Sequence, residues 1–272
     1  MRRKYAYYAI WLFILTIIIC GCIYLGKTVE IQINTENLVD AEVTVDIKIE
    51  DNEEEKEEIS VVSKEDNEEE TVFDFSLIPE YSGEAYVVVN GNVPFFTEED
   101  MVTTSYENYS ELDELGRCGV CVASVGIDIM STEDREGIGN VKPSGWMQAK
   151  YPGVVNGSYL YNRCHLIGFQ LTGENDNDGN LITGTRYLNI DGMLAFENMV
   201  ADYVKETQNH VLYRVTPIFE NDNLLASGVL MEAKSVEDDG EDILFCVYCY
   251  NVQPGVLINY TNGSSSLETT KE

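Results

Sequence analysis

The segment Tyr161–Gly168, with the sequence YNRCHLIG, is the most informative part of this chain. It places a histidine, His165, two residues after an arginine, Arg163. A second segment, residues 180–189, reads NLITGTRYLN, so an asparagine stands at each end of it, and Glu197 follows eight residues later. The chain has only two histidines, so a reaction that needs a histidine has almost no other residue to use.

These residue types are the ones that metal-dependent cleavage of a phosphodiester requires. A neutral imidazole such as that of His165 can take a proton from water near neutral pH. The amide oxygen of Asn189 and the carboxylate of Glu197 are ligands that suit a hard cation, and a guanidinium matches the geometry of a phosphate. The pattern therefore predicts a phosphodiester-cleaving site with one metal ion and with His165 as the general base.

The same residues resemble the non-specific DNA/RNA endonucleases of the ββα-metal superfamily, in particular the bacterial branch associated with DNA uptake. The Asp-Arg-Gly-His motif of that family corresponds here to Asn162-Arg163-Cys164-His165. The resemblance runs from about Tyr81 to Gly263 and departs from the motif at two positions. Asn162 stands where the family has Asp, and Cys164 stands where it has Gly.

The resemblance implies a role for each site residue and a cofactor, Mg²⁺, with Mn²⁺ as a substitute. It makes His165 the catalytic base and Asn189 the direct metal ligand, with Glu197 orienting a metal-bound water. It places Asn180 as a residue that positions the site, and Arg163 and Arg186 near the phosphate. The other histidine, His210, begins a predicted strand far from the motif, and we expect it to be structural.

The net charge is strongly negative in both halves of the chain. Residues 1–75 hold 18 acidic and 7 basic residues, and residues 76–272 hold 30 acidic and 10 basic residues, a net charge of −20. Binding to a phosphate backbone usually rests on a basic surface, so this charge opposes a nuclease. Clustering of six cations around the site would reconcile the two signals: Arg117, Arg135, Lys142, Lys150, Arg163 and Arg186.

The N-terminus has the pattern of a membrane signal. The basic residues 2–4 precede Tyr5–Gly26, which is 22 residues long and has no charge. A helix of that length, at about 1.5 Å per residue, spans the roughly 30 Å hydrocarbon core and leaves the rest of the chain outside. An uncleaved anchor is favoured, but a lipoprotein acylated at Cys22 and a cleaved signal peptide are alternatives. All three alternatives export the catalytic domain, and the anchor and the lipoprotein both predict a cell-membrane protein whose catalytic domain is extracellular.

The predicted fold class is α+β, with a central antiparallel sheet and a ββα-metal catalytic core after the membrane segment and an acidic spacer. The predicted parts are a membrane anchor or signal at 1–26, an acidic spacer at 27–75, a nuclease domain at 76–263 and a disordered tail at 264–272. The dense carboxylate runs favour a flexible spacer. Strand-like alternation at 31–33 and 43–49 favours a small accessory β element instead.

Periodicity predicts the main elements of the nuclease domain. Strands are expected at 86–89, 118–125, 159–161, 210–219, 228–233 and 243–252. The segment 192–207 has one apolar stripe at helical spacing, formed by Met193, Phe196, Val200, Tyr203 and Val204. The polar segment 105–116 predicts a helix or an ordered loop, a short helix is expected from Ser131 to Gly137, and the Arg-Cys-His motif is expected in a turn.

Two C-x-x-C pairs, Cys118/Cys121 and Cys246/Cys249, resemble the ligand spacing of a zinc site. Both pairs lie in β-patterned runs, where residues three apart point to opposite faces and cannot chelate one ion. We therefore expect buried thiols, with a disulfide as the alternative.

Two functions from different classes remain. The first is an exported, sequence-tolerant endonuclease that acts on DNA, with RNA as a further substrate, and is tethered to the membrane. The second is a non-catalytic surface protein that uses a nuclease-like fold to bind a partner, which the acidity favours. The combination of His165, Asn189 and Glu197 favours the enzyme, because a binding module has no need of all three.

Overall fold

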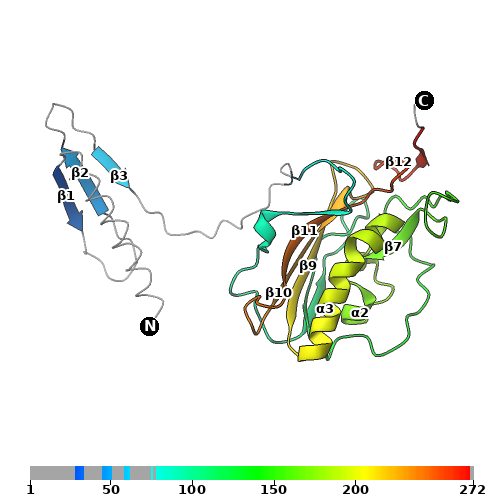
Figure 1. Cartoon of the computed structure of the whole chain (residues 1–272), viewed down its shortest axis with the longest axis horizontal. Coiled ribbons are helices and arrows are strands. Elements are labelled where there is room, and N and C mark those ends of the chain that lie inside the picture. Colours follow the sequence, from blue (N-terminus) through cyan, green and yellow to red (C-terminus); the bar gives the residue numbers. More distant parts are fainter. Residues whose placement is uncertain (1–27, 34–44, 51–57, 62–74, 76–77, 270–272) are drawn as a thin grey trace. The chain divides into compact units, whose positions relative to one another are not determined.

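The computed structural model describes residues 28–33, 45–50, 58–61, 75 and 78–269. The predicted membrane segment Tyr5–Gly26, with the acylation candidate Cys22, lies outside these residues. The chain divides into two units, Met1–Val72 and Phe73–Glu272 (Figure 1). Within the part that the structure describes, no helix is long and apolar enough to cross a membrane.

The N-terminal unit contains a three-stranded antiparallel sheet. Its strands are β1 (Thr28–Ile33), β2 (Val45–Glu50) and β3 (Glu58–Val61), in the order β1-β2-β3. Each strand has β-branched residues, which favour extended backbone. The small accessory β element considered for the segment 27–75 is therefore present among its described residues.

The C-terminal unit is built on a six-stranded antiparallel sheet with the strand order β4-β11-β10-β9-β6-β5. Its strands are β4 (Tyr86–Val88), β5 (Tyr106–Tyr109), β6 (Cys121–Val125), β9 (Val211–Ile218), β10 (Gly228–Ser235) and β11 (Leu244–Tyr250). The strands expected near 86–89, 118–125, 210–219, 228–233 and 243–252 are confirmed. The central antiparallel sheet of the predicted fold class is therefore present.

Alternate residues of the central strands enter two different cores. Along β10, Val229 and Met231 belong to the larger core cluster and Leu230 belongs to a second one. Along β11, Cys246 lies in the second cluster and Cys249 in the larger one. This is the alternation of faces that a β-strand imposes. It explains why the middle strands are apolar at almost every position.

The helix α3 (Leu194–Thr207) covers one face of this sheet, and the short helix α2 (Phe169–Thr172) lies beside it (Figure 1). The predicted stripe is confirmed, because its five members are all buried: Met193, Phe196, Val200, Tyr203 and Val204. They join the larger core cluster with residues of β9, β10 and β11. Helix position and orientation are therefore set by packing against the sheet.

A separate hairpin precedes α3 and completes a ββα unit. Its strands β7 (Tyr161–His165) and β8 (Leu181–Thr185) pair antiparallel, with His165 opposite Leu181. A π-helical turn, η4 (Leu188–Met193), then leads directly into α3. The motif expected in a turn is therefore a strand, whose pairing with β8 fixes the direction of each motif side chain.

One prediction about local structure is wrong in part, because only residues 110–116 of the segment 105–116 form a loop, and a second prediction is wrong. The segment 105–116 contains the edge strand β5, because Tyr106 and Tyr109 favour a pleated surface and pair with β6. No helix begins at Ser131, where the described chain runs as an irregular loop up to about residue 141. This loop has no apolar stripe and carries two glycines, Gly137 and Gly139, which disfavour a helix.

The tail after Gly263 is also more ordered than expected. Ser265–Leu267 form β13, which pairs with β12 (Val256–Ile258). The backbone N–H of Glu268 donates to the carbonyl oxygen of Gly255 at 3.0 Å, which extends the pairing. A polar, serine-rich segment can therefore be held by backbone hydrogen bonds even though it has almost no apolar residues.

Candidate active site

Five of the six predicted site residues meet in one pocket of about 540 Å³ beside the ββα unit. Its lining includes His165 and Arg163 from β7, Arg186 after β8, and Asn189 and Glu197 from the helical segment. The irregular loop and the chain that follows it contribute the opposite side, with Arg135, Ile138, Trp146, Gln148 and Tyr159. Asn180 does not line the pocket.

The ring of His165 is buried and its two nitrogens have different partners. Nε2 lies 2.8 Å from the carbonyl oxygen of Asn175, which can only accept, so Nε2 carries the proton and donates it. Nδ1 lies 3.0 Å from Nη2 of Arg135 and accepts a hydrogen bond from it. Nδ1 is therefore the nitrogen whose lone pair can take a proton from a water molecule.

The protein holds His165 in the neutral form. Burial lowers the pKa of the imidazole to about 4, and the nearby charge of Arg135 acts in the same direction. The hydrogen bonds with the backbone at Asn175 and Glu174 oppose this shift but do not overcome it. A general base must be unprotonated before it acts, so this environment suits the role.

Asn180 braces the chain directly after His165. Its side chain is fully buried, and its Oδ1 accepts a hydrogen bond from Ile167 N at 2.8 Å. Its Nδ2 donates to the carbonyl oxygen of Ile167 at 2.9 Å, and its own carbonyl accepts from Leu166 N at 2.9 Å. Three bonds thus fix the backbone between β7 and α2, which fits the positioning role that the resemblance implies.

Asn189 and Glu197 lie on consecutive turns of the helical segment and offer oxygen ligands to the pocket. Oδ1 of Asn189 accepts a hydrogen bond from the thiol of Cys164, with 3.1 Å between the oxygen and Sγ. The carboxylate of Glu197 lies against Gly168, where an added Cβ would be 2.9 Å from Oε2. A side chain at position 168 would therefore displace the carboxylate.

The carboxylate of Glu197 has an unusual environment. Burial raises its pKa to about 7, and the charge of Arg135 only partly offsets this effect. No residue in the described part of the chain donates a hydrogen bond to it, so its lone pairs are available to a ligand. A bound cation would compensate for the burial of this charge.

The donor set fits a hard divalent cation. One amide oxygen and one carboxylate are the oxygen ligands that Mg²⁺ prefers, and Mg²⁺ usually keeps several of its waters. Across the described residues, no group of three or more His, Cys, Asp or Glu side chains could hold a metal ion. An ion at Asn189 and Glu197 would therefore be mostly hydrated, with space for a phosphate oxygen.

The arginines of the pocket differ in their hydrogen-bond partners. Arg163 donates from Nε to the carbonyl of Val141 and from Nη2 to that of Gly139, and its guanidinium lies 4.2 Å from the ring centroid of Trp146. It therefore holds the irregular loop against β7. Nε of Arg186 is buried and has no hydrogen-bond partner in the part of the chain that the structure describes, a costly state that an anion would relieve.

Arg135 belongs to the site, although the sequence marked it only as one of six nearby cations. Its contact with His165 arises because the segment expected to form a helix is an irregular loop. The residue type and its place upstream of the motif gave a weak signal. The direction of its side chain depends on the path of the loop, which has no periodic pattern.

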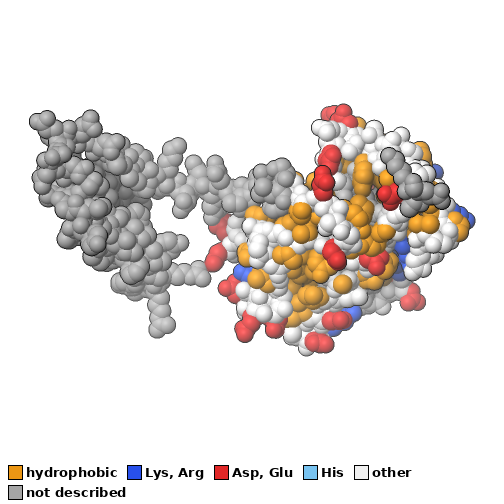
Figure 2. Space-filling model, turned by 45° about the horizontal axis from the view of Figure 1, so that its top comes forward, with side chains coloured by type: hydrophobic (Ala, Val, Ile, Leu, Met, Phe, Trp, Pro, Cys, Tyr) orange, Lys and Arg blue, Asp and Glu red, His pale blue; other side chains and the backbone are white. Residues whose placement is uncertain are grey.

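Positive charge gathers in this pocket even though the chain is acidic. Three arginines and one carboxylate line it, and Nζ of Lys150 lies 4.4 Å from the ring centroid of Tyr159 on its wall. The cation Arg117 instead pairs with Asp113 outside the pocket. Figure 2 shows acidic side chains dispersed around a face of the C-terminal unit, with hydrophobic side chains between them. The expected clustering is therefore supported for Arg135, Arg163, Arg186 and Lys150.

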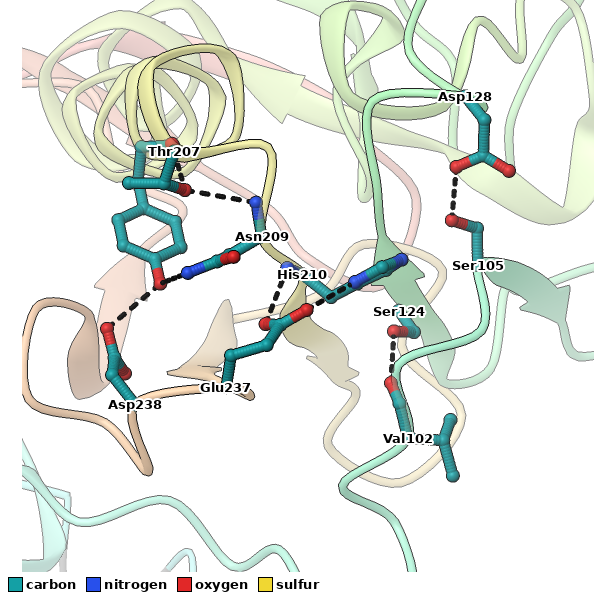
Figure 3. A network of polar contacts seen from close by, with 10 residues as sticks. Val102, Ser105, Ser124, Asp128, Thr207, Asn209, His210, Glu237 and Asp238 are labelled. Carbon is teal, nitrogen blue, oxygen red and sulfur yellow. Dashed lines mark hydrogen bonds and ion pairs between the residues drawn. The ribbon is translucent and has the colours of Figure 1, made fainter.

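The second histidine lies in a different polar network (Figure 3). Nδ1 of His210 lies 2.7 Å from Oε1 of Glu237, and its backbone N–H donates to Oε2 at 2.8 Å. Nearby, the hydroxyl of Ser105 donates to Asp128. His210 does not line the pocket, and its contacts support the structural role expected for it.

The five cysteines in the described part of the chain are free and buried. Cys246 and Cys249 face opposite sides of the sheet, as predicted. The expectation of opposite faces is wrong for the other pair, because Cys118 precedes β6 and shares a core cluster with Cys121. Both of these thiols donate to carbonyl oxygens of residues 178–181.

The chain belongs to the DNA/RNA non-specific endonuclease family. The model of this family matches residues 97–237, which is more than half of the 272 residues and contains the whole ββα unit. No curated protein matches the chain.

Solved structures agree with this assignment. NucA from Streptococcus agalactiae with no metal bound aligns with a TM-score of 0.62 and 24% identity, over 71% of this chain and 92% of that one. The same protein with a magnesium ion bound gives 0.55 and 26%, over 62% and 81%. Sda1 nuclease with a bound zinc ion gives 0.51 and 29%, over 62% and 83%.

Proposed function

We propose that this protein is a Mg²⁺-dependent endonuclease that hydrolyses phosphodiester bonds in DNA, and in RNA as a second substrate, largely without sequence preference. One observation carries the proposal above the others. A neutral, buried histidine whose Nδ1 contacts only the guanidinium of Arg135 shares a pocket with an amide oxygen and with a carboxylate that has no hydrogen-bond donor among the described residues. Family membership and a magnesium-bound neighbour with 26% identity support the same function.

His165 acts as the general base in the proposed reaction. Nδ1 takes a proton from a water molecule while the water oxygen attacks the phosphorus, and the bond from phosphorus to the leaving ester oxygen breaks. The hydrogen bond from Nε2 to Asn175 holds the ring in the correct tautomer and orientation. Because Arg135 now donates to Nδ1, the substrate phosphate has to draw its guanidinium away before the base can act.

Asn189 and Glu197 hold the cation, directly or through its water. When bound, Mg²⁺ supplies positive charge that stabilises the transition state and the leaving oxygen. Arg186, whose Nε has no hydrogen-bond partner among the described residues, binds a phosphate oxygen. Arg163 contributes charge while it holds the loop at 139–141. Because these groups read the phosphate backbone, cleavage is tolerant of sequence.

The cation itself requires a test, because one neighbour carries magnesium and another carries zinc. Full-length protein is incubated with plasmid DNA and, separately, with a structured RNA, in EDTA and then with Mg²⁺, Mn²⁺ or Zn²⁺. We expect the nucleic acid to be cleaved with Mg²⁺ and with Mn²⁺, and we expect no cleavage in EDTA. Turnover that is unaffected by EDTA would exclude the metal role. Binding without cleavage under every condition would favour the non-catalytic binding protein.

The proposed location is the outer side of the cell membrane, with residues 1–26 as an anchor and the acidic segment as a spacer. The uncharged run Tyr5–Gly26 after three basic residues supports this location. Fractionation of cells that express Cys22→Ala separates the two membrane-bound alternatives. Release of the variant into the medium would identify a lipid anchor, and retention would favour a spanning helix.

A further inference from the structure

The thiol of Cys164 makes a contact that the nuclease motif does not contain. Cys164 is completely buried in β7, and its Sγ lies 3.1 Å from Oδ1 of Asn189. A cysteine side chain that is not bound to a metal carries its proton at neutral pH, so Sγ can act as an S–H donor to this oxygen.

The structure makes space for this side chain on the neighbouring strand. A Cβ added at Gly184 would lie 2.6 Å from Cβ and 3.2 Å from Sγ of Cys164. Gly184 belongs to β8, which pairs with β7 next to this point. The absence of a side chain at 184 therefore permits the cysteine, and the thiol is seated between β8 and η4, with Met193 Sδ at 3.5 Å.

The contact can decide which way the Asn189 amide points. An amide has an oxygen that accepts and a nitrogen that only donates, and the two ends have nearly the same shape. An S–H donor favours the orientation with Oδ1 toward Sγ and disfavours Nδ2 there. A carbonyl oxygen has two lone pairs, so Oδ1 can accept from the thiol and still bind a cation.

We propose that Cys164 is a positioning residue that fixes the side-chain amide of Asn189 in its metal-binding orientation. This inference rests on the proposed function, because it assumes that Asn189 is a metal ligand. Groups that orient metal ligands typically change metal affinity by 10–100-fold when they are removed. A thiol is a weak donor, so we expect an effect of about 10-fold.

The experiment measures Mn²⁺ binding to the full chain by electron paramagnetic resonance, without substrate, and uses thermal unfolding to confirm that each variant is folded. Cys164→Ala should weaken Mn²⁺ binding by about 10-fold, and Cys164→Ser, which keeps a donor, should restore most of it. The matched control is Cys249→Ala, which removes another fully buried thiol that contacts a methionine sulfur at 3.5 Å. It should bind Mn²⁺ like the wild type.

A second background separates orientation from simple packing. Asn189→Asp replaces the amide with a carboxylate whose two oxygens are equivalent, so no end has to be selected. Cys164→Ala should then cost little metal affinity in this background. An equal loss in both backgrounds, or no loss in either, would overturn the inference. Wild-type protein that binds no Mn²⁺, or binds it equally after Asn189→Ala, would instead overturn the proposed metal site.

Discussion

The two histidines of the chain lie in two different regions, the polar network around His210 and the pocket around His165. Each region also contains a glutamate, but the hydrogen bonding of the His and the Glu differs between them. In the surface network, His210 and Glu237 bond to each other through both the side chain and the backbone of the histidine. In the pocket, Glu197 has no donor among the described residues, and Nδ1 of His165 is reached only by Arg135, an exposed side chain on a loop. One region satisfies its polar groups, and the other leaves them available.

The ion pair between Glu232 and Arg214 shows that burial alone does not leave a carboxylate without hydrogen-bond partners. The carboxylate of Glu232 is almost completely buried, yet it accepts hydrogen bonds from Nε and Nη2 of Arg214 and from Phe95 N. Glu197 is also poorly hydrated, but the protein provides it with no such partners. A buried polar group without a partner is costly, so its presence in a pocket identifies a group kept for a ligand.

The largest expected difference between the two regions is in activity. His165→Ala should lower kcat/KM for DNA cleavage by about 10²–10⁴-fold, the usual contribution of a general base. His210→Ala, the matched control, should leave kcat/KM within about twofold of the wild type, because His210 lies outside the pocket. A plasmid-nicking assay in Mg²⁺ measures both. Similar losses in the two variants would remove the distinction between the regions.

Substitutions of Glu232 and Glu197 should differ most in their effect on the unfolding free energy. Glu232→Ala leaves the guanidinium of Arg214 without its partner, and breaking a buried pair in this way costs about 3–5 kcal/mol of unfolding free energy. Glu197→Gln removes a charge that Arg135 compensates only in part and that has no hydrogen-bond donor among the described residues, so its unfolding free energy should change by less than about 1 kcal/mol. Urea denaturation of the metal-free proteins tests this. A larger loss in Glu197→Gln would show that Glu197 has a structural partner.

The next prediction concerns the pH dependence of kcat/KM, which should report the lowered pKa of His165. Because burial lowers the pKa of His165 to about 4, the base stays neutral and kcat/KM should not decline through the ordinary histidine range near pH 6.5. The acid limb should appear only as the pH approaches about 4. The pKa of Glu197 is raised to about 7, so the profile is measured with saturating Mg²⁺ and repeated in Glu197→Gln. A midpoint close to 6.5 in both proteins would show that the base is not the buried imidazole.

The same shift has a consequence for stability. The unfolded chain takes up a proton at His165 below its ordinary pKa of about 6.5, but the folded chain does so only near 4. The unfolded state is therefore favoured progressively as the pH falls from about 6.5 to about 4. His165→Ala should lose this part of the pH dependence and keep the rest, which urea titrations at several pH values would reveal.

The site was largely predictable because its residues lie close together in sequence. One hairpin and the helical segment that follows it contain His165, Asn189 and Glu197. Their short separation in sequence therefore predicts that the three side chains lie close together. Five strands of the six-stranded sheet and the α3 stripe were predictable from hydrophobic periodicity alone. Their alternation and three-to-four-residue steps reflect direct packing against a core.

The remainder depended on contacts that no periodic pattern encodes. Arg135 reaches His165 from 30 residues away through a loop that was predicted to be helical. The role of Cys164 depends on a missing side chain at Gly184 and on one thiol-to-amide distance. The strand β13 rests on backbone hydrogen bonds, to which side-chain polarity gives no guide.

The smallest expected effect concerns the charges that approach the substrate. Arg135, Arg163, Arg186 and Lys150 are the cations at the pocket, so a log–log plot of duplex binding against salt should have a slope no steeper than about −4. Residues 76–272 carry a net charge of −20, so long-range repulsion should slow association at the lowest ionic strength. Monovalent salt should therefore first raise activity, by screening, and then lower it.

Lys150→Ala tests this at a single residue. It should weaken binding uniformly across sequences and reduce the slope by no more than about 1. Lys205→Ala, on the exposed side of α3 and away from the pocket, is the control and should leave the slope unchanged. Activity that falls steeply from the lowest salt upward, with equal effects of the two lysines, would mean that a broader basic surface captures the substrate. Substrate binding would then not be confined to the pocket, and cations outside the pocket would contribute as much to it as cations at the pocket.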